Sequence, residues 1–212
     1  MTKPIAYTTV KGYGETEISI QRSRFIAYIN RVDTEEEAVD FVQKIAKKHW
    51  DATHNCYAYI VQGENEVQRS SDDGEPAGTA GRPILEVIKS RELTNTAIVI
   101  TRYFGGIKLG AGGLIRAYSS SASAGLDNTG LVDWNLQRKL TVTVDYPSMG
   151  KVEHALRQSG FELEKTRFTE VVTFPLWVPE GSVQAILDMV AEQTSGSGLV
   201  HFHEREHRPH PR

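Results

Sequence analysis

The sequence predicts an α+β protein of two domains, and three observations lead to this prediction. Alternating and β-branched runs predict strands, and amphipathic stretches between them predict helices. Residues 137–204 contain a complete βαββαβ order of their own, which is the ferredoxin-like arrangement. The turn residues in the stretch 127–136 predict a boundary ahead of that order. The first domain is therefore expected to span residues 15–130.

Composition limits the class of protein. The chain has 212 residues, enough for each domain to bury a core, and its single cysteine excludes an internal disulfide framework. No stretch has the length of a membrane span and the start lacks a signal-peptide pattern, so a cytoplasmic protein with no membrane partner is expected. The net charge of −3 argues against bulk electrostatic capture of nucleic acid and confines any phosphate contact to a local patch.

The first elements follow from alternation and capping signals. Residues 1–14 are expected to form a loosely ordered lead-in. Alternation over residues 15–21 and 24–32 predicts the two strands of a hairpin. An amphipathic helix is expected next, with Asp33 as its N-cap and Glu36 at the capping-box position three residues later.

The apolar run 53–61 predicts the next strand, and it contains the only cysteine. His54 and Cys56 stand two residues apart and share one face, which raises the question of a catalytic or metal-binding pair. A metal site normally needs further Cys or His ligands at a defined spacing, and none accompanies this pair. The favoured interpretation is a buried and inert cysteine.

An acidic motif occupies residues 70–83, where Asp72, Asp73 and Glu75 stand within four positions. A helix is expected to start near Thr79. The acids have a structural interpretation as caps and turn residues, which we favour. The alternatives are that they ligate a cation that bridges to phosphate, or that they pair with the arginines of the next motif.

A glycine-rich motif follows the buried strand predicted at residues 97–101, which is expected to end near Phe104. Five glycines stand within nine residues: Gly105, Gly106, Gly110, Gly112 and Gly113. Such density is kept mainly where the chain needs positive φ or a close approach to its backbone. From Gly113 onward a helix is predicted, with one stripe made of Leu114, Ala117, Tyr118, Ser121 and Ala122.

The strand, loop and helix start direct unpaired amides and the positive end of a helix dipole into one loop, which suits a phosphate. Arg102, Lys108 and Arg116 bracket this loop and could contact the same anion. The alternative is that the glycines only permit a tight turn and close helix packing. Neither a Walker loop nor a dinucleotide fingerprint is present.

The second domain is predicted to start with a strand at 137–145. Ser148 is expected to cap a helix that closes at Gly160, a strand pair follows at 161–166 and 170–178, and a second helix and a last strand complete the order. Residues 205–212 are expected to form a frayed polar tail. His201 and His203 share a strand face, but a polar terminus explains the histidines there better than a metal site does.

Two segments are similar to the signatures of a known family. Ser71–Leu85, SDDGEPAGTAGRPIL, and Arg102–Ser119, RYFGGIKLGAGGLIRAYS, resemble the IMPACT family, specifically its bacterial YigZ-like branch, and the resemblance runs from about Glu15 to His203. It implies an N-terminal domain similar to the second domain of ribosomal protein S5 and a C-terminal domain similar to the last domain of elongation factor G. Both relatives work on the ribosome, so RNA or the ribosome is the expected partner.

Three functions remain open at this stage. The first is a non-enzymatic factor that binds RNA or the ribosome and modulates translation, with Tyr103 or Phe104 stacking on a base. The second is an enzyme acting on a phosphorylated or otherwise anionic small molecule, which requires the acidic and glycine motifs to meet in one cleft. The third is a protein-interaction module with a protein partner. No catalytic triad, metal cluster or cofactor motif is predicted.

Overall fold

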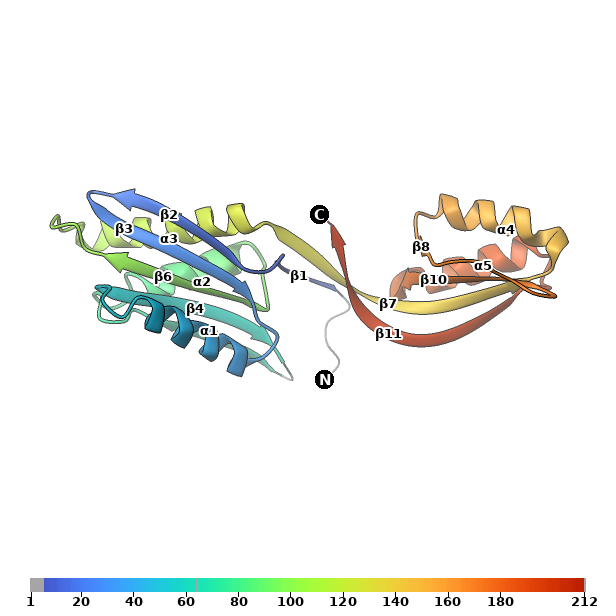
Figure 1. The fold of residues 1–212 in the computed structure, drawn as a ribbon, viewed down its shortest axis with the longest axis horizontal. Coiled ribbons are helices and arrows are strands. Elements are labelled where there is room, and N and C mark those ends of the chain that lie inside the picture. The colour runs from blue at the N-terminus through green and yellow to red at the C-terminus, as the bar shows by residue number, and fades with distance from the viewer. Residues whose placement is uncertain (1–5, 64, 212) are drawn as a thin grey trace. The chain divides into compact units, whose positions relative to one another are not determined.

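The computed structural model describes residues 6–63 and 65–211, and its contacts divide the chain into two compact units (Figure 1). The first unit comprises residues 1–133 with 211–212, and the second comprises residues 134–210. Each unit combines helices with a β-sheet, so the α+β class with two domains is confirmed. The units are described separately below.

The first unit is built on a five-stranded sheet in the order β2-β3-β6-β4-β5, in which every neighbouring pair is antiparallel. Its strands are β2 (Gly14–Ile20), β3 (Ser23–Arg31), β4 (His54–Gln62), β5 (Glu66–Ser71) and β6 (Thr96–Tyr103). The predicted hairpin is therefore confirmed as β2 and β3. The helices are α1 (Glu35–Lys48), α2 (Gly81–Ser90) and α3 (Gly110–Thr129).

The two faces of this sheet are covered by different helices. Side chains such as Phe25 and Ile100 form one core with α2 and α3. Side chains such as Tyr28 and Val99 form a second core with α1. Because successive residues of a strand point to opposite faces, β3 and β6 must be apolar on both sides, which explains their continuous hydrophobic runs. The predicted stripe of α3 is confirmed, since all five of its residues are buried.

The second unit has the predicted ferredoxin-like order. Its elements are β7 (Leu131–Val144), α4 (Tyr146–Gln158), β8 (Glu162–Leu163), β9 (Arg167–Phe168), β10 (Val172–Pro179), η1 (Glu180–Ser182), α5 (Val183–Gln193) and β11 (Leu199–Pro211). β10 lies between β7 and β8, and β11 pairs with the other side of β7. Leu156, Phe174 and Ile186 belong to the core between this sheet and its two helices.

Two predicted caps are wrong by one to three residues. The N-cap of α1 is Thr34, not Asp33, because the Thr34 side chain accepts a hydrogen bond from the Glu37 amide while the Glu37 carboxylate accepts one from the Asp33 amide, 2.7 Å away. In α4 the N-cap is Asp145, whose Oδ1 accepts from the amide of Ser148. In both helices more than one side chain of capping type stands near the start, and the observed hydrogen bonds identify the one that caps.

Three segments expected to be irregular are ordered. Ala6–Val10, within the expected lead-in, form strand β1, which lies beside β7 in the sheet order. The turn-rich stretch 127–136 is the end of α3 and the start of β7, with Gly130 between them. The expected tail continues β11 to Pro211, and in this strand His203 bonds Thr141 through Nε2 at 2.8 Å. The parts of these predictions that concern residues 1–5 and 212 lie outside the described residues.

Candidate functional site

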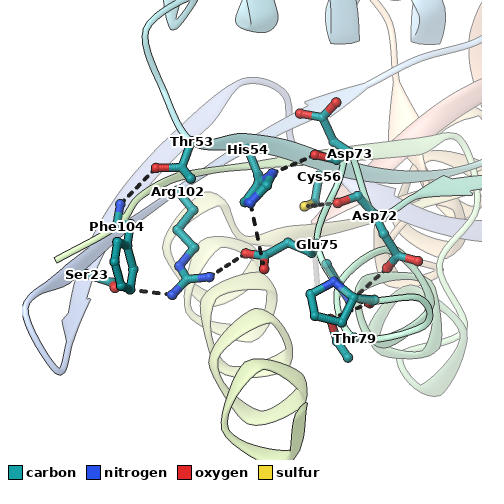
Figure 2. A network of polar contacts seen from close by, with 12 residues as sticks. Ser23, Thr53, His54, Cys56, Asp72, Asp73, Glu75, Thr79, Arg102 and Phe104 are labelled. Atoms are coloured by element: carbon teal, nitrogen blue, oxygen red, sulfur yellow. Dashed lines mark hydrogen bonds and ion pairs between the residues drawn. The ribbon is translucent and has the colours of Figure 1, made fainter. Parts of the chain in front are cut away.

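The acidic and glycine motifs meet beside the paired strands β4 and β6. His54 of β4 lies directly opposite Arg102 of β6 in the antiparallel register, so both side chains are on the face covered by α2 and α3. The acidic loop joins β5 to α2 and comes back over the start of β4, where it contacts His54 and Asn55 (Figure 2). Pairing of β4 with β6 therefore brings together two motifs that are far apart in the sequence.

Asp72 and Asp73 hold the acidic loop in place. The carboxylate of Asp72 accepts hydrogen bonds from the amides of Gly78, Ala80 and Gly81 at 2.8–2.9 Å. Burial raises the pKa of Asp72, but these three donors outweigh burial and leave the pKa below its ordinary value. Asp73 accepts from the amide of Asn55 at 2.6 Å. The geometry thus agrees with the structural interpretation for these two acids.

Glu75 forms a buried ion pair with Arg102. Its Oε1 lies 2.6 Å from Nη1 of Arg102 and accepts a second hydrogen bond from the Tyr118 hydroxyl at 2.7 Å. The Arg102 guanidinium lies over the Phe25 and Phe104 rings at 5.3 and 5.5 Å, which adds cation–π attraction. Arg102 is therefore committed within the protein, and it is not a free cation for an external phosphate.

Cys56 is buried beside this pair, as the sequence predicted. Its thiol is within hydrogen-bond distance of the Asp72 carbonyl at 3.0 Å and of the Tyr118 hydroxyl at 3.3 Å. Burial raises the pKa of Cys56 to about 12, and it also raises the pKa of Tyr118 above the ordinary range of a phenol. Both groups are neutral at physiological pH, so Cys56 is no candidate nucleophile.

The glycine motif contains the start of α3, which lies three residues earlier than predicted. The helix begins at Gly110, with φ of +69°, and no side chain caps its first turn. At Gly105 a Cβ atom would lie 2.0 Å from the backbone of Arg22, so the β2–β3 turn can approach this loop only because Gly105 has no side chain. The loop therefore presents the first amides of α3, through Gly112, which have no intrahelical acceptor, at the end of a 20-residue helix.

The remaining predicted cations differ from Arg102. Lys108 and Arg116 are both exposed. Among residues 6–63 and 65–211, neither side chain has an ion-pair partner. Gly113 and Arg116 line a shallow depression of about 230 Å³ next to Leu109. These two cations, together with the α3 amides, are the groups in the motif that remain available to an anion.

A pocket of about 390 Å³ lies where the two motifs meet. Its lining residues come from the start of β4, the acidic loop, the end of β6 and the start of α3: Thr53, His54, Glu75, Pro76, Arg102, Phe104, Lys108, Leu109, Gly110, Ala111 and Leu114. Hydrogen-bond donors of Lys108 and the α3 amides stand at the glycine loop, and acceptors stand on His54 and Glu75. Pockets of this size hold small ligands in proteins.

Tyr103 and Phe104 are separated by strand alternation. Tyr103 lies on the α1 face, where its hydroxyl donates to Asp51 at 3.1 Å and contacts His49 at 2.9 Å. It is therefore not part of the pocket, contrary to its grouping with the glycine motif. Phe104 lines the pocket with 46% of its surface exposed, so its ring remains available for stacking.

The sequence interpretation did not assign His54, Thr53 or Ser23 to the site. Thr53 Oγ1 accepts from the amide of Phe104 at 3.0 Å, and Ser23 Oγ lies 3.4 Å from Nη2 of Arg102 (Figure 2). The signal for His54 was its position at the start of a strand, but only the β4–β6 register shows that it faces the glycine motif. Long-range strand pairing of this kind cannot be read from local periodicity.

The described part of the chain has neither a candidate metal cluster nor a helix that could cross a membrane. Within residues 6–63 and 65–211, no three His, Cys, Asp or Glu side chains are grouped so that they could hold a metal ion. None of the helices in those ranges combines the length and the apolar character that crossing a membrane requires.

Each of the two units matches a known protein family. Residues 21–126 match the Impact N-terminal domain, and residues 142–197 match a domain of unknown function, DUF1949. The chain is 51% identical to IMPACT family member YvyE of Bacillus subtilis over 92% of this chain and 90% of that protein. It is 32% identical to IMPACT family member YigZ of Escherichia coli over 84% and 88% of the two chains.

A solved structure also resembles the whole chain. The crystal structure of a hypothetical protein is 27% identical, with a TM-score of 0.60, and the match covers 96% of this chain and 99% of the other. The two family models cover both motifs of the site, within residues 21–126, and residues 142–197 of the ferredoxin-like unit. By its sequence matches, the chain belongs to the IMPACT family.

Proposed function

We propose that this protein is a non-enzymatic cytoplasmic factor that binds RNA, free or on the ribosome, and modulates translation. The observation that carries the proposal is the start of α3, where amides without a side-chain cap stand beside Lys108 and Arg116, two exposed cations that form no ion pair with any residue of 6–63 or 65–211. A helix N-terminus with adjacent basic side chains is a favourable site for a phosphate. Consecutive phosphates of one strand can contact the amides and the two cations.

Single-stranded RNA fits this surface better than a duplex does. Phe104 is half exposed next to the α3 amides, and an aromatic ring can stack on an unpaired base. The patch is small, which is consistent with the net charge of −3, because electrostatic attraction is then confined to a few phosphates. The resemblance of the two motifs to a family whose domains are similar to ribosome-acting proteins also supports an RNA partner.

The experiment that tests this function is co-sedimentation with ribosomes and with total RNA over a salt series. The informative variant is Lys108→Ala/Arg116→Ala. Its matched control is Lys44→Ala/Lys47→Ala, which removes the same charge from exposed positions of α1 on the opposite face of the sheet. We expect salt-sensitive binding by the wild type and the control, and loss of binding by the first variant. Absence of binding to both partners at low salt contradicts the proposal.

A further inference from the structure

The pocket beside the α3 start offers acceptors that the protein itself does not use. His54 and Glu75 point toward one another at the inner end of this pocket (Figure 2). Nε2 of His54 lies 3.9 Å from Oε2 of Glu75, which is too long for a hydrogen bond between them. The two atoms therefore stand side by side as neighbouring polar groups that face the pocket.

The hydrogen bond of His54 fixes which ring nitrogen is the acceptor. Nδ1 lies 2.6 Å from the backbone carbonyl oxygen of Asp73. A carbonyl oxygen can only accept, so Nδ1 carries the proton and donates it. In neutral His54 the lone pair is consequently on Nε2, directed toward the pocket and Glu75.

The two carboxylate oxygens of Glu75 differ in their hydrogen bonds, and the side chain is only 3% exposed. Oε1 receives both the Arg102 guanidinium and the Tyr118 hydroxyl. Oε2 accepts no hydrogen bond from any described residue. Nε of Arg102 is also buried without a partner among the described residues. Buried polar atoms are normally hydrogen-bonded, so the unpartnered Nε of Arg102, in the same ion pair as Oε2 of Glu75, favours a polar ligand at this place.

The positions of these groups restrict the chemistry of that ligand. Acceptors on His54 and Glu75, 3.9 Å apart, can receive hydroxyl groups on two neighbouring carbon atoms. At the other end, Lys108 and the amides of Gly110 and Ala111 suit a phosphate. The lining of the pocket also includes Phe104, on whose ring a base can stack.

We infer that this pocket binds one ribonucleotide unit, with its phosphate at the start of α3 and its ribose 2′- and 3′-hydroxyls on Glu75 and His54. The inference rests on the proposed function, because it uses the same phosphate contact, and it adds recognition of the sugar. The 2′-hydroxyl is the group by which a protein separates RNA from DNA. The unit is either a free mononucleotide or the 3′-terminal nucleotide of an RNA strand, since both carry this pair of hydroxyls.

The test compares adenosine 5′-monophosphate with 2′-deoxyadenosine 5′-monophosphate and with inorganic phosphate, by calorimetry on the full chain. A hydrogen bond to a charged group contributes about 1.5–3 kcal/mol, so we expect the ribonucleotide to bind about ten- to hundredfold more tightly than the deoxy form. A short RNA with an ordinary 3′ end is compared with one ending in a 2′,3′-dideoxynucleotide. Weaker binding of the second assigns the pocket to an RNA end, and equal binding assigns it to a free mononucleotide.

Two variants test whether Glu75 and His54 are the groups that distinguish ribonucleotides from deoxynucleotides. Glu75→Gln keeps the size of the side chain but breaks a buried ion pair and can reduce folding. His54→Ala removes the other acceptor at a partly exposed position. Because the 3′-hydroxyl is assigned to His54, the ratio measured for this variant is that of the affinities for adenosine 5′-monophosphate and 3′-deoxyadenosine 5′-monophosphate. We expect His54→Ala to lower this ratio toward one, while Lys44→Ala/Lys47→Ala leaves it unchanged.

Equal affinity of the wild type for the two mononucleotides overturns the inference, and so does an undiminished ratio in His54→Ala. These failures are distinct from failure of the proposed function. Salt-sensitive RNA binding without sugar discrimination leaves the function standing and removes the pocket inference. If the protein discriminates between the two mononucleotides but binds neither RNA nor ribosomes, the pocket inference stands and the proposed function fails.

Discussion

Oε1 of Glu75 lies 2.6 Å from Nη1 of Arg102, and this contact joins the acidic motif to the glycine motif. The two side chains are 3% and 6% exposed, so the charges are removed from water together. A buried pair of this kind is strongly destabilising when one partner is lost, because the other charge remains uncompensated. The contact therefore fixes the position of the acidic loop over the pocket.

We expect Glu75→Gln or Arg102→Met alone to lower the free energy of unfolding by about 3–5 kcal/mol, as measured by urea denaturation. The double variant Glu75→Leu/Arg102→Met should recover much of this loss, since apolar residues can replace a buried pair without an unpaired charge. Single changes that cost less than about 1 kcal/mol would show that the pair is solvated, contrary to its burial.

Gly105 is expected to be intolerant of a side chain. In Gly105→Ala the Cβ atom would meet the Arg22 backbone at 2.0 Å, so the β2–β3 turn must move and the unfolding free energy should fall by about 1–3 kcal/mol or more. Gly112→Ala is the control, because its nearest neighbour is a flexible arginine side-chain atom at 3.7 Å and the residue is helical. The control should be neutral or stabilising by up to about 1 kcal/mol. Similar losses in both variants would contradict this explanation.

The N-cap of α1 can be tested by a pair of alanine variants. Thr34→Ala removes the side-chain acceptor of the Glu37 amide and should cost about 0.5–2 kcal/mol in thermal or urea unfolding. Asp33→Ala removes an exposed ion pair with Arg31 and should cost at most about 1 kcal/mol. If Asp33→Ala costs more than Thr34→Ala, the capping assignment is wrong.

Cys56 should make stability depend on pH in the alkaline range. Its folded-state pKa of about 12 lies above the ordinary thiol value of 9.0, so the folded protein holds this proton more tightly than the unfolded chain does. That contribution is complete below pH 9 and is lost as the pH rises toward 12. The difference in unfolding free energy between wild type and Cys56→Ala should therefore shrink as the pH rises from 9.0 toward about 12. The folded protein should also resist iodoacetamide at pH 8, whereas rapid alkylation would contradict the burial of this thiol.

Much of the fold was predictable because local patterns and tertiary packing agree. The β2–β3 hairpin, the buried stripe of α3 and the βαββαβ order of the second unit all follow from periodicity. Segments predicted to be irregular from their polar sequence are strands where pairing within the sheet, and not the local sequence, determines their structure. Ala6–Val10 lies next to β7 in the sheet, and β11, which includes most of the expected tail, also pairs with β7.

The candidate site was predictable in its motifs but not in its pairings. The density of glycine between β6 and α3 correctly indicated a close backbone approach and positive φ. Arg102 carries the same charge as Lys108 and Arg116, and its commitment to Glu75 follows from burial that no local pattern reveals. Tyr103 is removed from the pocket by the alternation of β6, and His54 is brought there by the register of β4.

We propose that RNA phosphates bind at the start of α3 through Lys108 and Arg116. This proposal is tested most directly by the salt dependence of the affinity for a single-stranded RNA. Each phosphate contact with a single strand contributes about 0.7 to the slope of log affinity against log salt concentration. We predict that Lys108→Ala/Arg116→Ala reduces this slope by about 1.4, for two lost contacts, while Lys44→Ala/Lys47→Ala leaves it unchanged. An identical slope in the wild type and in the Lys108→Ala/Arg116→Ala variant would contradict the claim.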